Sequence, residues 1–128
     1  MALSAKVTRL QAWVLAARPK TLTAAVAPVL VGTGLAAHDG ALSILPAAAA
    51  LLGAVLIQIG TNLANDYYDF VRGADAEDRV GPIRVTQAGL LSPASVRNAM
   101  AGVLTSAVFV GVYLVAIGGW PIVWIGVA

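Results

Sequence analysis

Residues 58–75 read QIGTNLANDYYDFVRGAD and lie at the end of a long apolar run, AALLGAVLIQIG. Two asparagines and three aspartates follow that run in close succession. The chain therefore places a dense polar cluster where an apolar segment ends. The rest of the sequence shows in which solvent that segment lies and what the cluster can bind.

The composition argues against an ordinary soluble domain. Of the 128 residues, 59% are hydrophobic and 11% are charged, whereas a soluble domain carries about 25% charged residues. So few charges cannot cover a water-exposed surface, and we expect a lipid bilayer around the chain. The lack of cysteine excludes disulfides, thiolate metal sites and cysteine nucleophiles. A net charge of +2 without a basic, aromatic-lined stripe argues against nucleic-acid binding.

The apolar segments predict an all-α, polytopic transmembrane helical bundle. A spanning helix needs about 20 mostly apolar residues. We expect an interfacial helix at about 3–17 and spans at about 20–37, 41–70, 93–117 and 121–128. The last segment would cover only about 10 Å of the roughly 30 Å hydrocarbon core. We therefore expect residues 1–128 to be the N-terminal part of one transmembrane domain in a longer protein.

Prolines mark the expected helix boundaries. Pro19 and Pro93 suit the first turn of a helix but not its interior, and Ser92 is a suitable N-cap before Pro93. Pro28 lies inside the first span and predicts a kink or a functional bend. The sequence GGWP at 118–121 predicts a tight turn at the membrane interface.

The basic residues predict the orientation of the chain in the membrane. The connections around 38–40 and 118–121 contain no lysine or arginine. Under the positive-inside rule, the N-terminus and the 66–97 connection should be cytoplasmic, as in a multi-pass protein of the cell (inner) membrane. All eight basic residues lie before or at the start of the first span, or between the end of the second span and the start of the third: Lys6, Arg9, Arg18, Lys20, Arg72, Arg79, Arg84 and Arg97.

The polar cluster would form one face of a helix if the second span continued through it. At about 100° per residue, Gln58, Asn62, Asn65, Asp66 and Asp69 fall within an arc of roughly 100°. Carboxylates at a helix C-terminus repel one another and the helix dipole, so a bound cation would stabilise them. Oxygen ligands without His or Cys suit Mg²⁺, which completes its shell with water and phosphate oxygens. The residues indicate a Mg²⁺ site at the membrane edge for a phosphorylated lipidic substrate.

Two other interpretations of these residues remain open. The acids could form a solvated cap at the end of the helix, or part of a cation or proton pathway in a transporter. Against the transporter, the acids lie at the membrane edge and no second broken helix follows. The single histidine, His38, lies in the outer connection and is expected to be inert.

The run Asn65-Asp66-Tyr67-Tyr68-Asp69 resembles the first aspartate-rich motif of the UbiA superfamily of intramembrane prenyltransferases. The run RVTQAG at 84–89 lies where those proteins have an arginine and, five residues later, a glycine. Four blocks are similar to the 1,4-dihydroxy-2-naphthoate polyprenyltransferase branch of the superfamily: ARPKTL at 17–22, VGTGLA at 31–36, LANDYYDFVRGAD at 63–75 and EDRVGPIR at 77–84.

The resemblance implies Mg²⁺-dependent transfer of a polyprenyl group from polyprenyl diphosphate to 1,4-dihydroxy-2-naphthoate. Loss of the carboxylate would give demethylmenaquinone, an intermediate of menaquinone biosynthesis. A related prenyltransferase with another aromatic acceptor, and a non-enzymatic cation-binding membrane protein or transporter fragment, remain the alternatives. The family also carries a second aspartate-rich motif, whereas no acid follows Asp78 here. The resemblance therefore implies half of a site, inactive by itself.

The resemblance also implies roles for individual residues. Asn65 and Asp69 match the metal-binding asparagine and aspartate, and Asp66, which matches the acid beside them, is a further metal candidate. Asp66 and Asp69 are also the catalytic candidates. The superfamily's last aspartate falls at Gly73, so Asp75, two residues later, is a less direct metal candidate.

The expected substrate-binding residues are basic, with one amide. Arg84 matches the loop arginine expected to contact the diphosphate. For Arg18, Lys20 and Arg79, anchoring at the membrane surface is an equally good interpretation. The full set is Asn62, Arg84, Arg79, Arg18 and Lys20.

Overall fold

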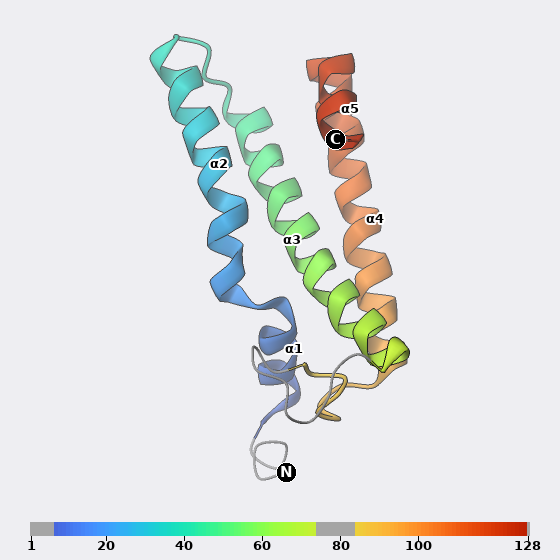
Figure 1. The fold of residues 1–128 in the computed structure, drawn as a ribbon. Helices are drawn as coiled ribbons and strands as arrows, with labels where there is room; N and C mark the ends of the chain where they lie inside the picture. The colour runs from blue at the N-terminus through green and yellow to red at the C-terminus, as the bar shows by residue number, and fades with distance from the viewer. Residues whose placement is uncertain (1–6, 74–83, 128) are drawn as a thin grey trace.

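A computed structural model describes residues 7–73 and 84–127, and these residues are helical apart from short connections (Figure 1). No strand occurs within these ranges, which confirms the all-α prediction. The helices are, in order, α1 (Arg9–Ala17), α2 (Pro19–His38), α3 (Ile44–Arg72), α4 (Pro93–Gly118) and α5 (Trp120–Val127).

Helices α2, α3 and α4 run alternately up and down, and α5 turns back along α4 (Figure 1). Helix α3 is central, because it packs against α1, α2 and α4. Helices α2, α3 and α4 are each long and apolar enough to cross a membrane. The 29 residues of α3 extend about 43 Å, more than the roughly 30 Å hydrocarbon core. At least one end of α3 must therefore lie outside the hydrocarbon.

The break between α1 and α2 falls at Arg18, as Pro19 predicts. Arg18 has a left-handed backbone (φ 53°), and its N–H donates to the carbonyl oxygens of Val14 and Leu15, both at 3.2 Å. Pro19 then occupies the first turn of α2. A positive φ is costly for a residue with a Cβ, so other contacts must stabilise this sharp change of direction.

Helix α1 is shorter than the expected 3–17 segment. It begins at Arg9 after a capping box between Thr8 and Gln11, while residues 1–6 lie outside the described part of the chain. Leu10 and Val14 are exposed at 74% and 48%, so α1 presents two apolar side chains away from the bundle, whereas Ala12 and Ala16 pack into it.

The other helix boundaries follow local chemistry. Ser92 caps α4 by accepting a hydrogen bond from the N–H of Ser95, and Pro93 follows in the first turn. Helix α2 continues through Pro28 as one helix. The turn expected at 118–121 is shorter than predicted, because Gly119 alone separates α4 from a helix that already includes Trp120. The positive φ of Gly119 (77°) reverses the chain in a single residue.

Two buried glycines let α3 and α4 approach each other closely. Gly53 and Gly60 lie two helical turns apart on one face of α3. A Cβ on Gly53 would lie 3.2 Å from a methyl carbon of Val110. A Cβ on Gly60 would overlap Cδ2 of Leu104 and lie 2.8 Å from its Cγ. Small residues at such crossings are typical of helices packed in membranes.

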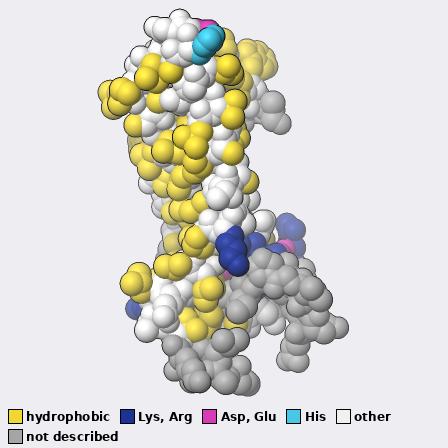
Figure 2. Space-filling view, turned by 90° about the vertical axis from the view of Figure 1, so that its left-hand side faces the viewer, with side chains coloured by type: hydrophobic (Ala, Val, Ile, Leu, Met, Phe, Trp, Pro, Cys, Tyr) yellow, Lys and Arg dark blue, Asp and Glu magenta, His cyan; other side chains and the backbone are white. Residues whose placement is uncertain are grey.

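The fully buried side chains gather at one end of the bundle. This end cluster joins α1, the last turns of α3, the 84–92 connection and the start of α4. Figure 2 shows basic and acidic side chains near this end, and the single histidine at the opposite end of the bundle. The end cluster consists of Ala12, Ala16, Leu63, Val85, Leu91 and Val96.

The close approach at Gly60 predicts a specific packing defect. Gly60→Ala should destabilise the protein by about 1–3 kcal/mol, because the added methyl overlaps Leu104. The loss should be smaller in a Leu104→Ala background, where the space exists. SDS-induced unfolding in mixed micelles would measure both changes. Gly102→Ala, which meets no atom within 4 Å, is the matched control; an equal loss in that variant would contradict the packing explanation.

Candidate functional site

The polar cluster of α3 has two sides that differ in exposure. We call the side with Asn65 and Asp69 the open edge, and the side with Asn62 and Asp66 the buried edge. Steps of about 100° order its members around the helix as Asn65, Gln58, Asp69, Asn62 and Asp66. Exposure falls in the same order: Asn65 is exposed, Gln58 and Asp69 are half-buried, and Asn62 and Asp66 are buried. The sequence placed all five on one face, but the two ends of that arc have different surroundings.

On the buried edge, Asn62 holds the break between α1 and α2. Its Nδ2 donates to the carbonyl oxygen of Ala17 at 2.9 Å and to Oγ1 of Thr21 at 2.8 Å. The Thr21 hydroxyl in turn donates to the carbonyl oxygen of Arg18 at 2.8 Å. These bonds satisfy carbonyl groups at the break and fix the left-handed conformation of Arg18.

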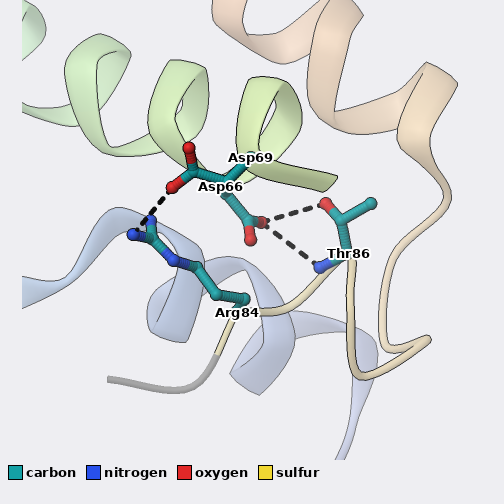
Figure 3. A network of polar contacts seen from close by, with 4 residues as sticks. All are labelled: Asp66, Asp69, Arg84 and Thr86. Carbon is teal, nitrogen blue, oxygen red and sulfur yellow. Dashed lines mark hydrogen bonds and ion pairs between the residues drawn. The ribbon is translucent and has the colours of Figure 1, made fainter. Parts of the chain in front are cut away.

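One turn further along α3, Asp66 holds the 84–92 connection. Its Oδ2 accepts hydrogen bonds from the N–H of Thr86 at 3.3 Å and from the Thr86 hydroxyl at 3.0 Å (Figure 3). Asp66 is 2% exposed, and Oδ1 accepts no hydrogen bond from the described part of the chain. The charges of Arg18 and Arg84 act on this carboxylate and offset part of the cost of burying it.

The connection that Asp66 holds is a compact turn. The N–H of Ala88 donates to the carbonyl of Arg84, and that of Leu90 to the carbonyl of Val85, both at 2.9 Å. Gly89 closes the turn with φ 75°, a conformation that glycine adopts without strain. Val85, 1% exposed, lies in the end cluster. The spacing between Arg84 and Gly89 is therefore the length of one closed turn.

On the open edge, Asp69 pairs with Arg84. Oδ2 of Asp69 lies 3.0 Å from Nη2 of Arg84, and the two side chains are 31% and 10% exposed (Figure 3). Asn65 lies one turn before Asp69 on the same side of α3. The open edge thus combines an amide oxygen, a carboxylate and a guanidinium from a distant segment.

The open edge fits part of a Mg²⁺ site. Asn65 and Asp69 can offer two oxygen ligands, and Mg²⁺ usually takes its remaining ligands from water and phosphate. The described residues contain no group of three His, Cys, Asp or Glu side chains that could hold a metal. Asp66 is turned to Thr86, and Asp75 lies outside the described ranges, so the fit rests on Asn65 and Asp69.

Two of the expected substrate-binding residues remain, Lys20 and Arg79. Lys20 is exposed near the start of α2, where its carbonyl accepts a hydrogen bond from Thr23. Arg79 falls outside the ranges that the structure describes. Sequence reasoning missed Thr21 and Thr86, which complete the two anchors. Nothing in the sequence marks these threonines except their positions near Arg18 and Arg84.

The division into two edges predicts unequal stability losses. Asp66→Ala should lower the free energy of unfolding by about 2–4 kcal/mol, because it leaves the buried Thr86 donors unsatisfied. Asp69→Ala should cost less than about 1 kcal/mol, because its ion pair is partly exposed. SDS titration in mixed micelles would measure the free energy of unfolding of both variants. Equal losses would show that the two carboxylates are not held differently.

Comparison with known proteins identifies a family and several relatives. The UbiA prenyltransferase family matches residues 25–128. The chain is 42% identical over 112 residues to a 1,4-dihydroxy-2-naphthoate octaprenyltransferase of Escherichia coli (strain K12), covering 88% of this chain and 36% of the relative. It is 46% identical over 102 residues to the protein of that name in Mycobacterium tuberculosis (80% and 35%). For the Bacillus subtilis protein the identity is 38% over 109 residues (85% and 35%).

The chain thus spans about a third of the length of these relatives. No solved structure gives a significant match.

Proposed function

Because this chain belongs to the UbiA prenyltransferase family, we propose that it is the N-terminal part of a membrane-embedded prenyltransferase. The enzyme transfers a polyprenyl group from polyprenyl diphosphate to 1,4-dihydroxy-2-naphthoate, with loss of the carboxylate, in menaquinone biosynthesis. The printed names of the relatives support this substrate pair. Their greater length supports an active site to which further helices contribute.

The observation that carries the proposal is the open edge itself. Asn65, Asp69 and Arg84 lie together at the end of a helix long enough to cross a bilayer. A substrate with an apolar chain and an anionic head needs this combination, because the chain can stay in lipid while the head reaches fixed charges. A purely solvated acidic cap would not need an arginine from the 84–92 connection.

The chemistry requires stabilisation of the departing diphosphate. Mg²⁺ bound by Asn65 and Asp69 would supply Lewis-acid stabilisation of its charge. Arg84 has five N–H donors, so it can donate to phosphate oxygens while keeping its contact with Asp69. Arg18, at the same end of the bundle, adds a second positive charge. Lys20, Arg79 and Asp75 stay candidates for further contacts with the metal-diphosphate head.

The three apolar helices and the family support a multi-pass membrane protein. We propose further that the α1 end of the bundle faces the cytoplasm and that the membrane is the cell membrane. Basic residues support this orientation. Among the described residues, each lysine or arginine lies in α1, in the connections at that end, or in a helix turn beside them.

The metal ligands predict a loss of transfer. Asp69→Asn or Asn65→Ala should lower prenyl transfer at least about a hundredfold, because the departing diphosphate loses stabilisation. Membranes containing the full-length protein would be assayed with labelled polyprenyl diphosphate, 1,4-dihydroxy-2-naphthoate and Mg²⁺. Thr105→Val, on an exposed part of α4, is the control. Undiminished transfer in Asp69→Asn would contradict the site, and transfer only to another aromatic acceptor would contradict the substrate.

The orientation predicts which face is accessible to reagents. The sequence has no cysteine, so a single introduced cysteine can be labelled alone. In intact cells, a membrane-impermeant maleimide should label His38→Cys but not Ala94→Cys, since these exposed positions lie at opposite ends of the bundle. Both should react in opened membranes. The reverse pattern in intact cells would place the α1 end outside.

A further inference from the structure

Asn62 and Asp66, on the buried edge of α3, each bind a segment of the chain that carries an arginine. Asn62 binds the segment 17–21, which carries Arg18, and Asp66 binds the segment 84–86, which carries Arg84. Asn62 and Asp66 are one helical turn apart. Two arginines that are distant in sequence are thereby brought to the same end of one helix.

We propose that Asn62 and Asp66 are positioning residues, which fix Arg18 and Arg84 around the open edge formed by Asn65 and Asp69. On this assignment neither Asn62 nor Asp66 is a ligand of the metal or the substrate. This differs from the roles that the sequence predicted for them. The inference rests on the proposed function, because it takes Arg18 and Arg84 to bind the diphosphate head of the substrate.

The amide of Asn62 has no donor left for a substrate. An amide nitrogen carries two hydrogens, and both have acceptors, in Ala17 and Thr21. The side chain is 3% exposed. These bonds hold the chain on either side of Arg18, whose left-handed backbone before Pro19 is unfavourable without support. Loss of the Asn62 contacts would let Arg18 relax and redirect its guanidinium.

Asp66 cannot turn to the open edge without breaking its own contacts. Three consecutive residues of the connection each have a different anchor: Arg84 pairs with Asp69, Val85 lies in the end cluster, and Thr86 binds Asp66. Rotation of Asp66 towards a metal would leave the N–H and hydroxyl of Thr86 buried without an acceptor. The direction of the Arg84 side chain therefore depends on the Asp66–Thr86 contact two residues away.

Asp66 also reduces the electrostatic cost of having Arg18 and Arg84 at the same end of α3. Arg18 and Arg84 both act on its carboxylate, and two guanidinium groups near each other would otherwise repel. The Asp66 carboxylate, on which both arginines act, offsets part of this repulsion. Asp66 thus acts through the arginine of the segment that it holds.

A double-mutant cycle tests the positioning role. Thr86→Val removes the hydroxyl donor, whereas Thr86→Ser keeps it. Affinity of the full-length protein in nanodiscs would be measured for inorganic diphosphate with Mg²⁺. Thr86→Val should weaken binding about tenfold and Thr86→Ser should be near wild type. In an Arg84→Gln background, Thr86→Val should cause little further loss, because the residue it positions is absent. Asn62→Ala should behave likewise with Arg18→Gln.

Trypsin gives a readout that does not depend on ligand. Cleavage after Arg84 requires the anchored turn to open, so Thr86→Val should accelerate it about tenfold and Thr86→Ser should not. Thr105→Val is again the matched control. Additive losses in the cycle, or unchanged cleavage in Thr86→Val, would overturn the positioning role. If the wild-type protein bound no Mg²⁺-diphosphate while Thr86→Val still accelerated cleavage, the proposed function would fail and the anchoring of Arg84 by Asp66 and Thr86 would stand.

Discussion

A carboxylate buried at the end of a helix long enough to cross a bilayer must be compensated, and the arrangement around Asp66 follows from that constraint. Its oxygen accepts both donors of Thr86, and two arginine charges act on it. Because Thr86 is fixed, the connection from Arg84 to Leu91 closes as a compact turn, and Val85 enters the end cluster. The cluster also includes Ala12 and Ala16, through which α1 packs against α3.

Because of this constraint, polar residues on one face of α3 have two different roles, one in holding the fold and one in binding a ligand. Residues on the buried edge of α3 use Nδ2 of Asn62 and Oδ2 of Asp66 to hold neighbouring segments of the chain, and on the proposed assignment they do not bind the ligand. On the open edge, Asn65 is exposed to solvent and Asp69 pairs with Arg84. A diphosphate site at a membrane edge needs both properties, since charges that bind an anion are effective only when rigidly placed.

Much of the fold could be predicted from the sequence because its signals are local. Apolar length predicts the three long helices, and Pro19 and Pro93 mark two of their starts. Helical periodicity correctly gathers the polar cluster within one arc. Periodicity gives an angle around α3, however, and does not say which neighbouring segment covers that angle. Asp66 therefore looked equivalent to Asp69, and Asn62 looked available to substrate. The roles of Thr21 and Thr86 arise only from tertiary contacts.

The most direct test of the account is an experimental structure of the full-length protein with Mg²⁺ and an unreactive polyprenyl thiolodiphosphate. The account predicts that the metal-bound diphosphate lies against Asn65, Asp69 and Arg84, while Asp66 keeps its contacts with Thr86. A structure in which Asp66 has left Thr86 to bind the metal, or in which the diphosphate lies away from Arg84, would contradict the division of α3 into an open edge and a buried edge.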